Sequence, residues 1–320
     1  MSEASVGVET AVAGASKRAH VSIAICTRDR PLFLERCVRS LFAMTGLDRI
    51  EPELVVVENA ETVSAATARL VEEAPKPWRA WACAEPRIGI PFARNRAVDA
   101  AVAHGVDALV FVDDDQTVPP EWLATLLEVQ AETGADAVQS ALNYVFERRG
   151  PHDAYVATGF QGRDGVDVVD VRFLATHGVL ITRRPIADWG LRFDERAPLA
   201  GGEDTRFFLD ATAFGAKLVV TGRTSANEHC PPAKQRLGWI LRRQRRLGYV
   251  QVVRRFKDRS RGAWLRHGAW RVARGTLWLP LVAVHRPSRT RELMRIAKGV
   301  GVVQALLGRD MREYERPLGR

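Results

Sequence analysis

The sequence contains few cysteines and no long apolar run. The four cysteines, Cys26, Cys37, Cys83 and Cys230, show no Cys-x-x-Cys spacing and are too sparse for a disulfide framework. We therefore expect free thiols and a reducing, cytoplasmic compartment. Because no run of about 18 uninterrupted apolar residues occurs, a transmembrane helix is not expected. Residues 1–19 also lack the apolar core of a signal peptide, and we expect them to form a disordered tail.

Acidic residues are scarce in the last quarter of the chain. Residues 234–320 contain 23 Lys and Arg but only 5 Asp and Glu, whereas residues 1–233 contain 24 basic and 33 acidic residues. The net charge of +9 therefore hides a C-terminal region with a balance of +18. Such a region favours an anionic partner: a membrane surface, a nucleic acid or a phosphorylated acceptor. With 46% hydrophobic residues, the chain as a whole can form a substantial core.

Strand and helix patterns alternate through the first 133 residues. Four apolar runs predict strands, at residues 20–26, 53–57, 78–83 and 108–112. Each is followed by a helical pattern, at residues 31–42, 62–73, 90–104 and 119–133. Four such units in succession imply right-handed crossovers and a largely parallel α/β sheet. Ligands of such sheets bind at the carboxyl ends of the strands.

The second half of the chain has a less regular pattern. We predict that residues 137–146 and 166–173 form strands of a second, partly antiparallel element. Further strand-like runs occur at residues 176–182 and 217–221. After Cys230-Pro231-Pro232 the composition becomes basic. We therefore expect a boundary between a domain of residues 20–232 and a basic, amphipathic helical region of residues 233–320.

Three adjacent carboxylates, Asp113, Asp114 and Asp115, follow the fourth predicted strand. Each carboxylate disfavours ionisation of its neighbours, so the cluster persists most easily where a divalent cation and phosphate groups neutralise it. Oxygen ligands of this kind suit Mg²⁺ or Mn²⁺ bridging a diphosphate. The alternative is a solvated acidic turn before the helix that begins near Pro119.

Five segments carry a resemblance to a known family: residues 21–31, 53–59, 89–96, 111–115 and 202–207. In this order they resemble the nucleotide loop, second strand, Gly-x-x-x-Ala-Arg-Asn segment, DxD motif and Glu-Asp motif of the family 2 glycosyltransferases. Residues 201–247 are most similar to bacterial exopolysaccharide and cell-envelope members, including those of succinoglycan biosynthesis. The resemblance implies the GT-A (nucleotide-diphospho-sugar transferase) fold, a Rossmann-like mixed α/β sheet flanked by helices. The basic helical extension would be an addition to it.

The resemblance also implies a binding site for a nucleotide-diphospho-sugar donor, for which we expect a UDP-sugar. Thr27, Arg28 and Glu58 are expected to line the nucleotide pocket; Glu58 stands where the family usually has Asp. The guanidinium of Arg94 is expected to pair with the diphosphate. The alternatives are a solvated strand-end carboxylate for Glu58 and an ordinary surface ion pair for Arg94.

The same resemblance assigns the metal ligands. Asp115 is expected to contact Mn²⁺ or Mg²⁺ directly, with Asp113 and Asp114 holding ribose and metal-bound water. The metal would offset charge on the departing nucleoside diphosphate. His229 resembles a third ligand of several relatives, although a lone histidine is more often structural. His177 is expected to be packed or to lie in the acceptor site.

Asp204 is the expected catalytic base, which takes a proton from the acceptor hydroxyl as it attacks the anomeric carbon. Glu203 beside it would orient acceptor or donor hydroxyls, and the two preceding glycines would allow the backbone to approach the sugar. A single base acting opposite the leaving diphosphate implies inversion at the anomeric carbon. The alternative is that Glu203 and Asp204 only favour a helix N-terminus electrostatically.

Two other functions fit parts of the sequence. A sugar nucleotidyltransferase would share the sheet and the acidic site, but it should have a glycine-rich phosphate loop, and residues 26–31 contain no glycine. A non-enzymatic protein could bind nucleic acid or an anionic surface through arginines interleaved with Trp239, Trp264, Trp270 and Trp278.

The same arginine and tryptophan pattern describes a helix lying in a bilayer interface. We favour this interpretation over nucleic-acid binding, because envelope glycosyltransferases commonly use acceptors linked to polyprenyl diphosphate. The protein is therefore expected to attach peripherally to the inner face of the plasma membrane and to act on a lipid-linked glycan.

Overall fold

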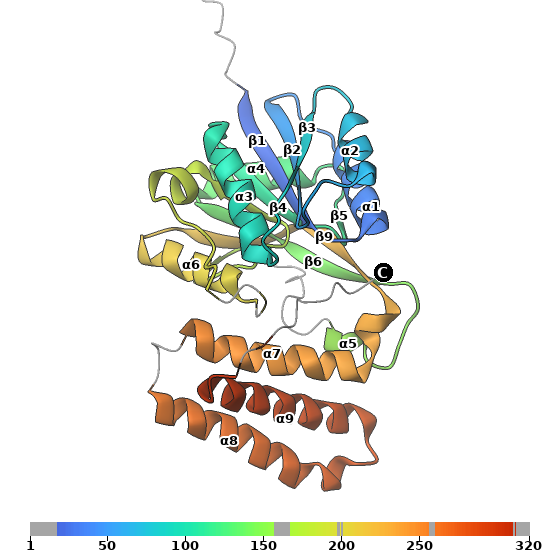
Figure 1. Cartoon of the computed structure of the whole chain (residues 1–320), viewed down its shortest axis with the longest axis vertical. Helices are drawn as coiled ribbons and strands as arrows, with labels where there is room; N and C mark the ends of the chain where they lie inside the picture. The colour runs from blue at the N-terminus through green and yellow to red at the C-terminus, as the bar shows by residue number, and fades with distance from the viewer. Residues whose placement is uncertain are drawn as a thin grey trace, which may run out of the picture.

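One mixed β-sheet forms the centre of the molecule (Figure 1). The computed structural model describes residues 18–156, 167–196, 199, 201–255, 260–309 and 311. Within these residues the sheet has nine strands, in the order β3-β2-β1-β4-β8-β6-β9-β5, with β7 paired to β9. Residues 1–17 of the predicted tail lie outside the described residues.

The parallel half of the sheet follows the predicted order of strands and helices. Its strands are β1 (Ala19–Thr27), β2 (Ile50–Glu58), β3 (Arg79–Ala84) and β4 (Ala108–Asp113). Its helices are α1 (Pro31–Phe42), α2 (Ala65–Glu72), α3 (Ile90–Ala103) and α4 (Trp122–Thr133). Thr27 lies opposite Glu58, and Cys26 lies opposite Asp113, so the polar residues that end these strands meet at one edge.

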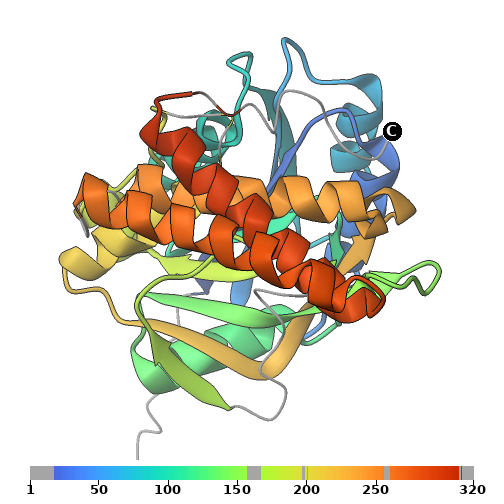
Figure 2. The same ribbon diagram turned by 90° about the horizontal axis from the view of Figure 1, so that it is seen from below.

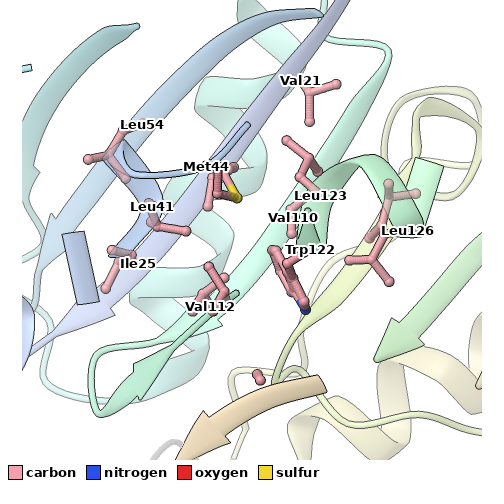
Figure 3. Close-up of a cluster of buried hydrophobic side chains, with 14 of the residues drawn as sticks. Val21, Ile25, Leu41, Met44, Leu54, Val110, Val112, Trp122, Leu123 and Leu126 are labelled. Carbon is pink, nitrogen blue, oxygen red and sulfur yellow. The ribbon is translucent and has the colours of Figure 1, made fainter. Parts of the chain in front are cut away.

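Side chains on the two faces of these strands form separate cores. Val21 and Ile25 of β1 belong to one cluster with Trp122 of α4, whereas Ala24 belongs to another with Ala97 of α3. Figure 3 shows the first cluster, in which strand side chains meet those of the helices. Successive strand residues point to opposite faces, so a strand covered on both sides requires a continuous apolar run.

The predicted second element is wrong, because the later strands join the same sheet. They are β5 (Gln116–Thr117), β6 (Ala137–Phe146), β7 (Val168–Val171), β8 (Val179–Thr182) and β9 (Leu218–Cys230). β8 runs antiparallel to β4 and β6, while β6 runs parallel to β9. β9 continues well beyond the predicted residues 217–221, and its second half pairs with β6 although it is polar. An apolar pattern indicates a strand but not its partner.

Three helices form a layer below the sheet, and α8 lies farthest from it (Figures 1 and 2). They are α7 (Leu237–Arg255), α8 (Arg261–Trp278) and α9 (Arg286–Leu306), with η4 (Pro280–Val282) between the last two. α9 packs between α7 and α8, and glycines allow the close approach. A Cβ atom added at Gly301 would lie 1.8 Å from the carbonyl oxygen of Arg245.

The three helices pack as one layer against the sheet and against one another, so they do not lie individually in a bilayer interface. α7 packs between the sheet and α9, and both Trp239 and Trp264 are buried, at 9% and 5% exposure. Trp270 and Trp278 remain exposed. None of the helices that the structure describes combines the length and the low polarity needed to cross a bilayer.

Candidate active site

The aspartate cluster lies at the carboxyl end of β4 between two cationic side chains. Asp114 accepts hydrogen bonds from the Thr27 hydroxyl at 2.8 Å and from Arg30 Nη1 at 2.9 Å. Asp115 accepts one from Lys234 Nζ at 2.8 Å. Burial raises the pKa of Asp114 despite the opposing charge of Arg30. Burial acts to raise the pKa of Asp115 as well, but the charges of Lys234 and Arg30 outweigh it, and this pKa is lowered.

Asp113 is the member of the cluster that water reaches. Its side chain is 43% exposed, and its Oδ1 atom lies 3.8 Å from Arg94 Nη2. Loss of hydration in its densely packed surroundings raises the pKa of Asp113 to about 7; Arg94 opposes this shift, and the carboxylates of Asp115 and Glu228 add to it. Arg94 therefore offsets only part of the cost of charging Asp113, and a bound cation would stabilise the charged carboxylate further.

Arg94 forms a buried ion pair with Glu203, the first residue of α6 (Glu203–Ala213). Both side chains are less than 10% exposed, and Arg94 also stacks over the ring of Phe193 at 5.6 Å. The Oε2 atom of Glu203 is buried and has no hydrogen-bond partner within the described residues. Arg94 thus joins the aspartates of β4 to the acidic motif of α6.

Asp204 occupies the first turn of α6. Its Oδ1 atom accepts a hydrogen bond from the Thr205 N–H at 2.6 Å. Burial and the neighbouring charge of Glu203 raise the pKa of Asp204, while Arg94 acts in the opposite direction. Gly202 before the pair has a φ of 78°, a conformation that favours glycine.

The predicted nucleotide residues line the adjacent strand ends. The Thr27 hydroxyl binds Asp114, as described above, and Glu58 Oε2 accepts a hydrogen bond from the Ser64 N–H at 2.9 Å. Arg28 lies half-buried in the loop after β1. Asn59 fixes the facing loop, because its amide donates to the carbonyl oxygen of Arg87 at 2.8 Å.

His229 lies near the end of β9, beside the aspartates. Its backbone N–H donates to the carbonyl oxygen of Asp115 at 2.8 Å, and its Nε2 atom is 3.0 Å from the Thr117 hydroxyl. No group of three or more His, Cys, Asp or Glu side chains within the described ranges could hold a metal ion. A cation bound at Asp115 would therefore need further oxygen ligands from elsewhere, such as a phosphorylated substrate.

His177 is a packed residue. Its ring contacts the amide of Gln139, with 3.0 Å between Nε2 atoms, and burial lowers its pKa to about 4. The ring is therefore neutral at physiological pH.

Sequence reasoning missed the two cations of the site, Arg30 and Lys234, and the carboxylate of Glu228. Arg30 lies inside the predicted nucleotide loop, two residues after Arg28. A second arginine in that loop was the signal that could have identified it as a site residue. Lys234 and Asp115 are 119 residues apart, and nothing in the local pattern around Lys234 indicates this partner.

Comparisons with known proteins identify the family of the chain. The family model described as glycosyl transferase family 2 matches residues 22–188. The succinoglycan biosynthesis protein ExoM of Rhizobium meliloti (strain 1021) is 28% identical over 313 residues, which cover 92% of this chain and 96% of that protein.

Two solved structures resemble the fold. The mannosyltransferase PcManGT from Pyrobaculum calidifontis, in complex with GDP-Man and Mn²⁺, aligns with a TM-score of 0.62 and 17% identity, covering 92% of this chain and 89% of its own. S. aureus TarS 1–349 in complex with UDP-GlcNAc aligns with a TM-score of 0.54 and 16% identity, covering 90% and 92%. These likenesses confirm the predicted GT-A fold. Together with the family match, they show that the chain is an enzyme that belongs to glycosyltransferase family 2.

Proposed function

We propose that the enzyme transfers a sugar from a nucleotide-diphospho-sugar, a UDP-sugar, to a hydroxyl group of a lipid-linked glycan during exopolysaccharide or cell-envelope synthesis. The observation that carries the proposal is the position of Arg94, which pairs with Glu203 and interacts electrostatically with both Asp113 and Asp204. A cation-binding cluster and a candidate base therefore share one site. The similarity of the chain to ExoM, TarS and PcManGT supports this class of reaction.

Asp204 acts as the base in this proposal. The acceptor oxygen attacks the anomeric carbon, its proton passes to the Asp204 carboxylate, and the bond from the anomeric carbon to the diphosphate oxygen breaks. The nucleoside diphosphate leaves from the opposite face, so the configuration is inverted. A raised pKa makes the Asp204 carboxylate a stronger base than an ordinary aspartate. Glu203, held by Arg94, orients the reacting hydroxyl groups.

The aspartates and the strand ends hold the donor. Asp115 and His229 would bind Mn²⁺ or Mg²⁺, with Asp113 and Asp114 supporting the ribose and the metal-bound water. When bound, the metal supplies charge that stabilises the leaving diphosphate. In this proposal the donor also contacts Thr27, Arg28, Glu58 and Arg94.

The end of α8 and the turn after it form the proposed membrane contact. They expose four apolar side chains, which we name the α8 tip: Leu277, Trp278, Leu281 and Val284. Exposed arginines flank the tip in the sequence: Arg274, Arg286 and Arg289. Apolar side chains among arginines suit an anionic bilayer surface. In this proposal residues 20–232 are the transferase domain, and residues 233–320 attach it peripherally to the inner face of the plasma membrane.

Donor hydrolysis tests the proposed reaction. We expect the wild-type enzyme to release a nucleoside diphosphate from one member of a panel of nucleotide-sugars when Mn²⁺ is present and not in EDTA. Asp115→Ala should lose this activity, while Asp113→Ala should weaken donor binding less severely. Near wild-type activity of Asp115→Ala in EDTA would show that the metal assignment is wrong.

A further inference from the structure

Lys234 is buried between two carboxylates of the acidic site. Its Nζ atom lies 2.8 Å from Asp115 Oδ2 and 2.7 Å from Glu228 Oε1. The residue is 8% exposed, so the two carboxylates provide the compensation that a buried ammonium requires. Burial acts to lower the pKa of Lys234, but the two carboxylates outweigh it and raise the pKa well above that of an ordinary lysine.

The backbone from which the Lys234 side chain extends is held in place by its neighbours. Lys234 lies in η2 (Pro232–Gln235), the turn that leads from β9 into α7. The next residue, Gln235, donates hydrogen bonds to the Arg148 carbonyl oxygen at 2.7 Å and to Asp153 Oδ1 at 2.8 Å. The turn therefore holds the lysine at the aspartates and connects them to the helical layer.

Lys234 binds the carboxylate that the proposed function assigns to the metal. Asp115 Oδ2 already accepts a charge-assisted hydrogen bond, which is stronger than one between neutral groups. A divalent cation on this carboxylate would lie beside the ammonium, and two cations so close repel each other strongly in a buried site. The ammonium and the metal therefore compete for Asp115.

We propose that Lys234 is the resident counter-ion of the metal site, which the divalent cation displaces from Asp115 when it arrives with the donor. This inference rests on the proposed metal-dependent function. The released ammonium, on a flexible four-carbon side chain, then pairs with the donor diphosphate. Metal alone must compete with Lys234, whereas metal with a diphosphate gives the lysine a new anionic partner. Metal binding and donor binding are thereby coupled.

Mn²⁺ titration without any nucleotide tests this coupling, with free Mn²⁺ measured by electron paramagnetic resonance. We expect Lys234→Met to bind Mn²⁺ at least about tenfold more tightly than the wild type, because the competitor is gone. UDP binding at saturating Mn²⁺ should become weaker in the same variant. Lys217→Met is the matched control, because Lys217 Nζ donates to the Thr133 carbonyl oxygen, outside the acidic cluster. It should keep both wild-type affinities.

Equal Mn²⁺ affinities for the wild type and Lys234→Met would overturn the inference. If wild-type donor hydrolysis still required Mn²⁺ in that case, the proposed function would stand without it. Hydrolysis that continued equally well in EDTA would instead contradict the metal-dependent function itself.

Acetylation of the wild-type protein by an amine-directed reagent provides a test that does not depend on the folding of a variant. Modification of Lys234, followed by mass spectrometry, should increase when Mn²⁺ is added and decrease when UDP follows. Modification that stays unchanged through both additions would also overturn the inference.

Discussion

Arg94 of α3 and Glu203 of α6, 109 residues apart in the sequence, form a buried ion pair at the centre of the site. The same guanidinium lies 3.8 Å from Asp113, so one arginine compensates charge on two elements. Removing one partner of a buried pair leaves the other charge without compensation, which is far more costly than losing an exposed pair. The predicted contact between Arg94 and the diphosphate stays a prediction.

Arg94→Ala should therefore lower the free energy of unfolding by about 3 kcal/mol or more, the range for breaking a buried ion pair. Urea denaturation measures the change. Arg96→Ala, on the exposed side of the same helix, is the control and should change stability by less than about 1 kcal/mol. Similar stabilities for the two variants would mean that the Arg94–Glu203 pair is energetically unimportant.

Asp204→Asn should reduce the rate of sugar transfer by at least about 10²-fold, the lower range for removing a general base. Donor affinity should stay unchanged, because the amide keeps the shape of the side chain. Asp210→Asn is the control and should keep the wild-type rate of transfer, since Asp210 lies on the same helix but pairs with Arg206. Equal losses in donor affinity and turnover for Asp204→Asn would indicate a structural role for Asp204.

The raised pKa of Asp113 predicts a dependence of stability on pH. Between its ordinary value near 4 and its folded value of about 7, the folded protein binds more protons at this site than the unfolded chain. The free energy of unfolding should therefore fall as the pH rises through this window, when EDTA keeps metal away. Asp113→Asn should remove part of this fall, measured by urea denaturation at pH 5 and pH 7.5. Asp99→Asn, an exposed control, should keep the wild-type fall. An unaltered fall in Asp113→Asn would contradict the assignment.

The sequence predicted the strands that are apolar on both faces. Residues 108–112 formed a continuous apolar run, and β4 is indeed buried between helices on both faces. The second half of β9 was missed because it carries residues such as Asn227, Glu228 and His229, which have no apolar period. These residues pair with β6 and β5, and only tertiary contacts reveal that pairing.

Sequence could predict only those site residues whose position follows from the end of a strand. Asp113 ends β4, Asp114 and Asp115 follow it, and the topology places them beside Thr27. The partners of these charges depend on which side chains reach them across the fold. Lys234 is one such side chain: its turn lies at the aspartates because β9 extends to residue 230.

The α8 tip predicts how the protein contacts a membrane. Leu277 and Leu281 are 72% and 74% exposed, and no described part of the chain covers them. Burying a leucine side chain fully is worth about 1.5–3 kcal/mol, and a basic residue near an anionic leaflet adds about 1 kcal/mol at most. Inserted apolar side chains and arginines together would therefore hold the enzyme at the surface reversibly.

Leu277→Ser combined with Leu281→Ser should weaken binding to vesicles containing phosphatidylserine by at least about tenfold, because the two side chains no longer insert. Sedimentation with vesicles at low salt measures binding, and donor hydrolysis in solution should stay at the wild-type level. Leu32→Ser is the matched control, since Leu32 on α1 is 79% exposed and lies outside the helical layer. Transfer to a lipid-linked acceptor should fall in the double variant and not in the control. Full-length wild-type protein that remained in the supernatant when vesicles were sedimented at low salt would contradict the membrane proposal. If the double variant bound vesicles as well as the wild type, the membrane contact would lie on a different surface.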